Sequence, residues 1–351
     1  MSKKVLMKGN EAIAEAAVRG GCRYFFGYPI TPQNEIPEYL SWRLPELGGA
    51  FVQAESEVSA INMVYGAASA GARAMTSSSS PGISLKQEGI SYIACAELPC
   101  VIVNMVRGGP GLGTIYPGQA DYFQSVKGGG HGDYKLLVYT PATVQEAVDI
   151  VHKAFDVADF YRVPVVILGD GTLGQTMEPV AMPEMKDAAK FPKKNWAANG
   201  CDGRERNIIN TLEMNPDKLE AITDRLFDTF EKIKKNETMF ESYFCDDAEI
   251  VFVAYGIASR ITKAAVNDLR SQGVKAGLLR PITVSPFPDG AIAKLADSKN
   301  VKKFVVAELS KGQMVEDVRL AVNGKKLVEF VGRTGGNFIS VEELIKIAGG
   351  K

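Results

Sequence analysis

The chain has 351 residues, of which 46% are hydrophobic and 23% charged, with a formal net charge of −1. This composition is typical of a globular protein long enough for two domains. Acidic and basic residues are well mixed, so we expect neither a nucleic-acid-binding face nor a membrane-binding surface.

The apolar runs are too short to span a bilayer, and the amino-terminal stretch lacks the pattern of a secretory signal. We therefore expect a cytoplasmic protein. The cysteines form no C-x-x-C pair and are scattered along the chain, at Cys22, Cys95, Cys100, Cys201 and Cys245. This spacing predicts free thiols rather than a metal or iron–sulfur site in this chain.

Helical and strand-like stretches alternate up to residue 170. The periodicity predicts helices over 10–21, 34–47, 56–72, 82–97 and 143–161, and strands over 22–28, 50–53, 73–78, 99–106, 135–140 and 163–170. This alternation predicts a doubly wound α/β domain, which we assign to residues 1–190.

A different pattern follows in residues 191–247, which we interpret as a linker and one long helix. Helical periodicity over 215–244 places six apolar residues on one stripe: Leu219, Ile222, Leu226, Phe227, Phe230 and Ile233. The α/β alternation resumes with strands over 249–256, 275–280, 302–309 and 327–332 and helices over 259–273 and from Gln313. We therefore predict a second, smaller α/β domain over 248–351.

Four stretches at strand ends or helix starts could carry chemistry, because ligands of open α/β sheets bind at the carboxyl ends of strands. They are "YPITP" (28–32), "QAESEVSAINMVYGAASAGA" (53–72), "TSSSSPGIS" (76–84) and "VRGGPGLGTIYPGQADY" (106–122). Each also has a structural explanation: a rigid turn, carboxylates favoured by a helix N-terminus, a polar loop, and a mobile glycine loop. The residues alone leave both interpretations open, although Arg107 after a buried strand suits a carboxylate or phosphate.

One further stretch imitates a cofactor motif. "GDG" at 169–171, with Asn195 downstream, resembles the start of a thiamine diphosphate and magnesium motif. The intervening segment is rich in proline and reads as linker, so we expect Asp170 to be structural and the chain to bind no metal.

Taken together, the stretches "GYPITP", "QAESE…YGAASAGARAMTSSSSPG" and "ELPCVIVNMVRGGPG…GQADY" resemble the 2-oxoacid:ferredoxin oxidoreductases, in the subunit with the pyrimidine-binding domain. "LLRPITVSPFP" and "VVAELSKGQMVEDV" resemble the transketolase C-terminal-like domain of that family. The resemblance covers nearly the whole chain and is strongest to the branch that acts on 2-oxoisovalerate (3-methyl-2-oxobutanoate).

The resemblance implies roles for individual residues. Glu57, nine residues before Gly66 of the "GA-x-x-AGA" stretch, corresponds to the glutamate that contacts N1′ of the aminopyrimidine. Thr31 corresponds to the residue that hydrogen-bonds the oxoacid, and Arg107 to the one that grips its carboxylate. These three are the expected catalytic residues. The remaining expected contacts are Tyr28, Pro29, Ser79 and Ser80 for the cofactor, and Gly108, Leu112 and Ile115 for the substrate.

The resemblance also implies partners. Thiamine diphosphate is expected to be shared with a diphosphate-binding beta-type subunit, with Mg²⁺ and [4Fe-4S] clusters on partner subunits and coenzyme A as co-substrate. A gamma-type subunit, a ferredoxin-like cluster subunit and external ferredoxin complete the expected assembly, a dimer of hetero-oligomers. Two alternatives stay open: an enzyme specific for 2-oxoglutarate or pyruvate, and a non-catalytic subunit that organises a complex.

The loop after Arg107 favours the branched substrate. It contains Leu112, Ile115 and Tyr116 but no Lys, Arg or His before Lys127. A 2-oxoglutarate enzyme needs a cation for the distal carboxylate, whereas an aliphatic side chain needs only apolar surface.

Overall fold

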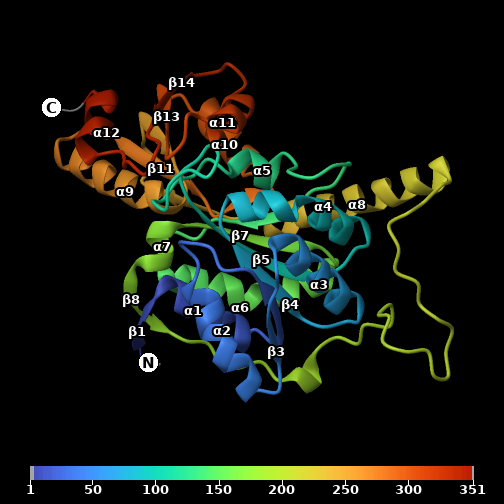
Figure 1. Ribbon diagram of the computed structural model, residues 1–351. Helices are drawn as coiled ribbons and strands as arrows, with labels where there is room; N and C mark the ends of the chain where they lie inside the picture. Colours follow the sequence, from blue (N-terminus) through green and yellow to red (C-terminus); the bar gives the residue numbers. More distant parts are fainter. Residues whose placement is uncertain (1–3, 350–351) are drawn as a thin grey trace.

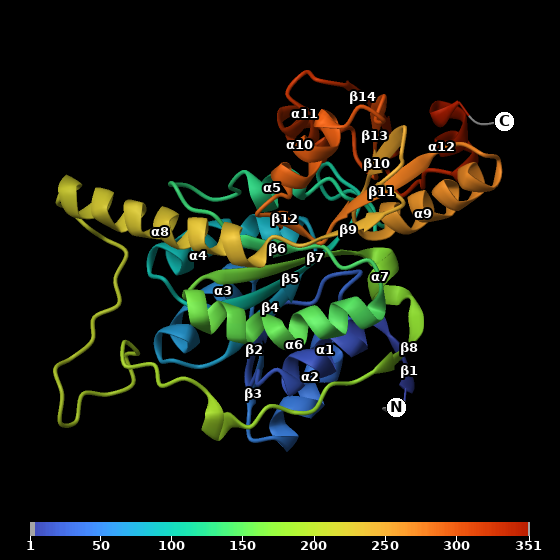
Figure 2. The same ribbon diagram turned by 180° about the vertical axis from the view of Figure 1, so that it is seen from behind.

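The computed structural model describes residues 4–349, which form two α/β lobes (Figures 1 and 2). The first lobe contains a seven-stranded sheet with the order β12-β6-β7-β5-β4-β2-β3. Its strands are β2 (Tyr24–Gly27), β3 (Ala50–Gln53), β4 (Ala74–Ser78), β5 (Cys100–Val106), β6 (Leu137–Tyr139), β7 (Pro164–Asp170) and β12 (Thr283–Ser285). All are parallel except β12, which pairs antiparallel with β6 at one edge.

Helices cover both faces of this sheet. One face packs on α1 (Gly9–Arg19), α2 (Glu35–Glu46) and α6 (Val144–Tyr161), and the other on α3 (Glu57–Ser69) and α4 (Pro81–Cys95). Strand β5 is almost entirely apolar because both of its faces are covered. Val101, Val103 and Met105 pack on the face covered by α1, α2 and α6, and Cys100 and Ile102 pack on the face covered by α3 and α4. The predicted doubly wound α/β domain is confirmed.

Several elements outside the two main sheets were not predicted from the sequence. Strand β1 (Lys4–Lys8) pairs antiparallel with β8 (Met177–Ala181), within a stretch interpreted as linker. A short 3₁₀ helix, η1 (Ala188–Lys190), precedes an extended segment, and α8 (Pro216–Glu237) then projects beyond the lobes at its amino-terminal end (Figures 1 and 2).

The second lobe has a five-stranded sheet with the order β14-β13-β10-β11-β9. Its strands are β9 (Phe240–Tyr243), β10 (Ile250–Val253), β11 (Ala276–Pro281), β13 (Lys303–Glu308) and β14 (Leu327–Gly332), and its helices are α9 (Gly256–Ser271), α10 (Asp289–Asp297), α11 (Met314–Val322) and α12 (Val341–Ala348). The helix predicted over 215–244 is too long, because residues 240–243 pair antiparallel with β11 instead. The second α/β unit is confirmed, while the division at residues 190 and 247 stays a prediction.

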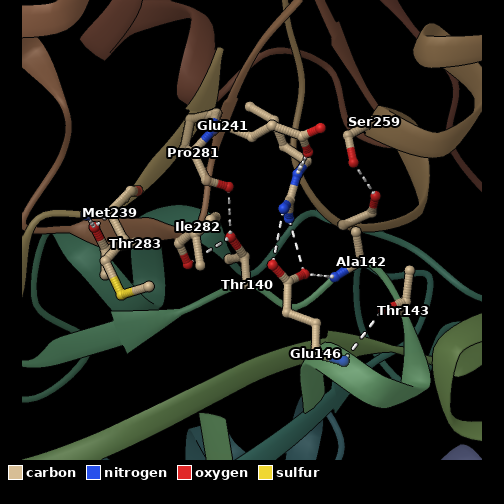
Figure 3. Close-up of polar contacts among 12 residues, drawn as sticks. Thr140, Ala142, Thr143, Glu146, Met239, Glu241, Ser259, Pro281, Ile282 and Thr283 are labelled. Carbon is tan, nitrogen blue, oxygen red and sulfur yellow. Dashed lines mark hydrogen bonds and ion pairs between the residues drawn. The ribbon is translucent and has the colours of Figure 1, made fainter. Parts of the chain in front are cut away.

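The two sheets are joined where β11 continues into β12. Arg280 donates to both carboxylate oxygens of Glu146 on α6 and, through Nε, to Glu241 on β9 at 2.8 Å. The Thr140 hydroxyl donates to the carbonyl of Pro281, and Figure 3 shows Glu146 and Glu241 approaching this joint from opposite sides. The ion pairs therefore connect three elements from both lobes.

Candidate functional site

The candidate site lies where four neighbouring strands end. In the order β5-β4-β2-β3, Arg107 follows β5, Ser79 and Ser80 follow β4, and the turn 28–32 follows β2. Glu57 begins α3, the helix after β3. Because the carboxyl ends of parallel strands meet at one edge, the four stretches selected from the sequence come together there.

Arg107 joins two of these stretches. Its guanidinium is buried, at 7% exposure, and donates to the carbonyl oxygens of Thr31 at 3.0 Å and Leu112 at 2.9 Å. Its Nε is buried and has no partner among residues 4–349. An arginine has five N–H donors, so the two bonds leave others available to a ligand.

The turn 28–32 leaves its threonine side chain accessible. Thr31 is exposed, as are Tyr28 and Pro29. Its backbone is fixed from two directions: Arg107 holds the Thr31 carbonyl, and the buried Gln33 side chain donates to the Tyr28 carbonyl at 3.3 Å. The Thr31 side chain is therefore exposed, while the backbone that bears it is held in place by two hydrogen bonds.

Glu57 and Glu55 have different environments although they are two residues apart. Glu57 is 6% exposed and lies against Gly82 of α4, where a Cβ atom would come within 2.6 Å of Glu57 Oε1. Glu55 is exposed and accepts a hydrogen bond from the Ser59 hydroxyl at 3.0 Å. Glycine at position 82 is therefore what allows α4 to approach the Glu57 carboxylate closely.

The serines after β4 divide into two groups. Ser78 Oγ and Ser79 Oγ are buried without a partner among residues 4–349. Ser80 has a left-handed backbone, with φ of 23°, and its hydroxyl bonds the backbone of Arg107 rather than capping α4. Its backbone N–H donates to Asn104, whose amide in turn donates to Asp121 at 2.9 Å.

The linked contacts from Ser80 through Asn104 to Asp121 were not predicted from the sequence. Asn104 lies inside a continuously apolar strand, and Asp121 lies 17 residues later in the glycine-rich stretch. Burial raises the pKa of the Asp121 carboxyl, while its bonds to Asn104 and Ser80 lower it. A polar residue within an otherwise apolar strand is the one signal that could have indicated it.

The loop from Gly108 to Tyr116 presents its apolar side chains at the surface. Gly108 is buried, but Leu112 is 82% exposed and Ile115 58% exposed. Lys127, the first cation after this loop, pairs with Asp317 of α11. The described chain thus provides apolar surface near Arg107 and has Lys127 engaged elsewhere.

Asp170 does not face the site with a free carboxylate. Its Oδ1 accepts from the backbone N–H groups of Thr172 and Leu173 at the start of α7 (Gly171–Gln175), and Oδ2 accepts from Ile257. Burial raises its pKa and these N–H groups lower it. Asn195 lies in the extended segment, where its carbonyl accepts from Asn207. Among residues 4–349 no group of three or more His, Cys, Asp or Glu residues could hold a metal.

The fold and the strand-end site define the class. A family model for the thiamine diphosphate-binding part of pyruvate flavodoxin/ferredoxin oxidoreductases matches residues 15–241, and one for core domain II of pyruvate:ferredoxin oxidoreductase matches 248–344. The chain belongs to this family, so the resemblance and fold class predicted from the sequence are confirmed. No helix within residues 4–349 is long and apolar enough to cross a membrane.

Several named relatives are similar over nearly their full length. Ketoisovalerate oxidoreductase subunit VorB of Methanothermobacter thermautotrophicus is 50% identical over 97% of this chain and 96% of its own. 2-Oxoglutarate synthase subunit KorA of Methanocaldococcus jannaschii is 37% identical (97% and 98%), and pyruvate synthase subunit PorA of Pyrococcus abyssi 28% (98% and 92%). All three relatives are named as subunits.

Among solved structures, 2-oxoglutarate:ferredoxin oxidoreductase from Magnetococcus marinus, with 2-oxoglutarate, coenzyme A and succinyl-CoA bound, superposes with a TM-score of 0.88 at 25% identity. The match covers 99% of this chain and 65% of that longer chain. A split-gene transketolase, at 14% identity and a TM-score of 0.60, shares the fold alone.

Proposed function

We propose that this chain is the subunit of a 2-oxoacid:ferredoxin oxidoreductase that contacts the cofactor pyrimidine and the substrate, and that the substrate is 2-oxoisovalerate. The net reaction takes one oxoacid, one coenzyme A and two oxidised ferredoxins to acyl-CoA, CO₂, two reduced ferredoxins and one proton. The observation that carries this proposal is the meeting of Glu57, Arg107 and the Thr31 turn at adjoining strand ends, in a chain half identical to VorB.

The residues at the site fit the pyrimidine side of thiamine diphosphate. Ser78 Oγ, Ser79 Oγ and Arg107 Nε are buried polar atoms without partners among residues 4–349, and buried polar groups normally have them. Glu57 would hold a proton shared with ring nitrogen N1′, with Tyr28, Pro29, Ser79 and Ser80 around the ring. When bound, the cofactor supplies the nucleophilic carbon and the electron sink that decarboxylation requires.

Arg107 and Thr31 would orient the oxoacid. The second N–H groups of the Arg107 terminal nitrogens suit a carboxylate, and the Thr31 hydroxyl would donate to the keto acid group. Because Arg107 already holds the Thr31 carbonyl, both substrate contacts are fixed relative to one another before binding. Gly108 would let the substrate approach the backbone, with Leu112 and Ile115 beside its side chain.

The remaining chemistry requires partner subunits. Both Asp170 carboxylate oxygens accept backbone N–H bonds, which supports placing the diphosphate and Mg²⁺ sites on a beta-type subunit. The scattered free cysteines support placing the [4Fe-4S] clusters on a ferredoxin-like subunit, from which external ferredoxin takes electrons. We include a gamma-type subunit and a dimer of such assemblies in the proposal, with the complex in the cytoplasm.

The substrate choice rests on the loop. Lys127 is paired with Asp317, and the exposed side chains of the loop are apolar, so a second carboxylate would lack a cation here. The test is to compare kcat/KM for 2-oxoisovalerate, pyruvate and 2-oxoglutarate in the purified complex, using viologen reduction that depends on coenzyme A. We expect 2-oxoisovalerate to exceed pyruvate by about 10–200-fold. Preference for 2-oxoglutarate would contradict the assignment, and a complex inactive with all three would favour a non-catalytic organising subunit.

A further inference from the structure

Lys86 is a buried lysine beside the site that the roles above do not use. It lies on α4 with no exposed surface, and its Nζ donates to the Thr76 hydroxyl at 2.7 Å and the Ser77 carbonyl at 3.0 Å. These two hydrogen bonds are its polar contacts among residues 4–349, and neither is to a carboxylate. Burying an ammonium group without an opposite charge is energetically costly, and fully buried lysines are therefore rare unless they are paired.

The position of Lys86 relates it to Glu57. Gly82 and Lys86 are four residues apart on α4 and therefore lie on the same face, one turn from each other. The Glu57 carboxylate lies against Gly82. Lys86 therefore lies one helical turn from Gly82 on the face of α4 that Glu57 contacts. Its Nζ is bonded to Thr76 and Ser77 near the carboxyl end of β4.

The other charged side chains near α4 are bonded to other groups: Glu88 of α4 accepts from the Tyr92 hydroxyl at the surface, and Arg107, which follows β5, donates to the carbonyls of Thr31 and Leu112. Helix α3 contributes Glu57 as its one charged residue, and β4 and β5 contribute none. On β7, Asp170 is bound by backbone N–H groups, and at the far end of α4 Arg225 of α8 pairs with Glu97. Burial lowers the pKa of Lys86 to about 7, and the charge of Glu57 opposes this shift.

Building on the function proposed above, we propose that Lys86 is a positioning residue: it places one buried positive charge on the face of α4 that Glu57 contacts, and this charge acts on the catalytic step that depends on Glu57. Ionised Glu57 favours the charged form of Lys86. When Glu57 shares a proton with a ligand, Lys86 holds its own proton less firmly.

The first test needs no cofactor and uses the full-length chain. An unfolded lysine keeps its proton up to a pH of about 10.4, whereas folded Lys86 releases it near neutral pH. The unfolded chain therefore binds more protons in this window, and stability should rise with pH through it. Urea midpoints measured from pH 6 to 10 should show this rise in the wild type, and it should be smaller in Lys86→Met.

Glu57→Gln tests the coupling itself. Without the Glu57 charge, Lys86 should lose its proton more readily, and the rise in midpoint should begin about one pH unit lower than in the wild type. A rise that begins at the same pH in both chains would overturn the proposal. Should Lys86→Met fail to fold, Lys86→Gln serves instead, because its amide can still donate to Thr76 and Ser77 but carries no charge.

The second test uses the assembled complex. Lys86→Met removes a buried positive charge near Glu57, so the acidic limb of the kcat profile should move to higher pH. Lys194→Met is the matched control, since Lys194 is a partly buried lysine whose pKa is also lowered by burial but which pairs with Asp159 outside the site. A profile that coincides with the wild type and with the control would refute the role of Lys86. Coupling in the urea experiment without oxoacid activity in the complex would refute the proposed function instead.

Discussion

At the scale of single residues, the surroundings of each side chain separate chemical from structural roles. Sequence spacing and the family resemblance selected Glu57 over Glu55, and the structure places Glu57 against α4 and Glu55 in solvent. Ser80 directly precedes α4 but does not cap it, because its hydroxyl bonds the Arg107 backbone. Lys86 could not be selected, since its environment depends on how α3, β4 and α4 pack.

Glu57→Gln should nearly abolish turnover while the complex still assembles. The amide cannot share a proton as the carboxyl does, and general acid–base catalysis contributes about 10²–10⁴-fold. Glu55→Gln is the matched control and should change kcat by less than about twofold, as expected for an exposed side chain. Steady-state kinetics on both complexes check this, and a severe effect of Glu55→Gln with a mild effect of Glu57→Gln would show that the assigned register is wrong.

Arg107→Lys should raise the KM for the oxoacid by about 10–100-fold, the cost of losing one or two charge-assisted bonds. A lysine cannot hold Thr31 and Leu112 in the fork geometry of a guanidinium and also grip a carboxylate. The KM for coenzyme A should change little, and measuring both constants in one preparation provides the control. Equal rises would indicate a phosphate-binding or structural arginine.

At the scale of elements, hydrophobic periodicity predicted the long regular segments and missed those formed by distant pairing. β1 pairs with β8 across about 170 residues of chain, and β9 exists because β11 lies beside it, so neither leaves a local signal. The stripe on α8 predicted a helix correctly. It did not predict that Leu219 and Phe227 stay exposed, because that depends on what lies beside the helix.

Side chains of the stretch 117–127 bond to the second lobe, and these long-range contacts could not be predicted from the sequence. Gln119 is buried, its amide donates to the Tyr255 carbonyl, and its oxygen accepts from the Leu309 backbone, both at 2.9 Å. The Tyr122 hydroxyl donates to Asp317 at 2.6 Å. The same stretch contains Asp121, so the second lobe supports the contacts that lead through Asn104 to Ser80 and Arg107.

Gln119→Ala should lower the free energy of unfolding by about 2–4 kcal/mol, because it leaves a buried N–H and a buried carbonyl without partners. It should also raise the KM for the oxoacid, since the segment holding Asp121 loosens. Gln124→Ala, whose bond to Ser84 is exposed, is the control and should stay within about 0.5 kcal/mol of the wild type. Urea unfolding measures the effect, and unchanged stability in Gln119→Ala would show that the lobes do not depend on this bridge.

At the scale of the whole molecule, the proposed function makes this chain one side of a site shared with a partner subunit. The apolar loop beside Arg107 is open, and three of the buried polar atoms without partners among residues 4–349, Ser78 Oγ, Ser79 Oγ and Arg107 Nε, lie at this edge of the sheet. Family membership and the location of the site at strand ends could be predicted from the sequence, whereas the order of the strands comes from the structure. The resemblance implied a beta-type facing subunit, but the residues it contributes could not be predicted because they are not in this chain.

The isolated chain should therefore bind thiamine diphosphate too weakly for detection by calorimetry at micromolar cofactor, with or without Mg²⁺. In the proposed function this chain contacts only the pyrimidine side of the cofactor, and both Asp170 oxygens already accept backbone hydrogen bonds. Tight binding that depends on Mg²⁺ and is lost in Asp170→Asn would show that this chain forms a diphosphate site. The assembled complex, which should bind the cofactor, is the positive control.

The position of β12 has a consequence for biosynthesis. The edge of the first sheet is completed by residues 283–285, after the chain has already formed β9, β10 and β11 of the other sheet. While the chain emerges from the ribosome, β6 therefore presents an open strand edge until more than four-fifths of the 351 residues have been translated. Open edges promote aggregation of nascent chains, so a fragment that ends before Thr283 should need a chaperone to stay monomeric, whereas one extended past Ser285 should not.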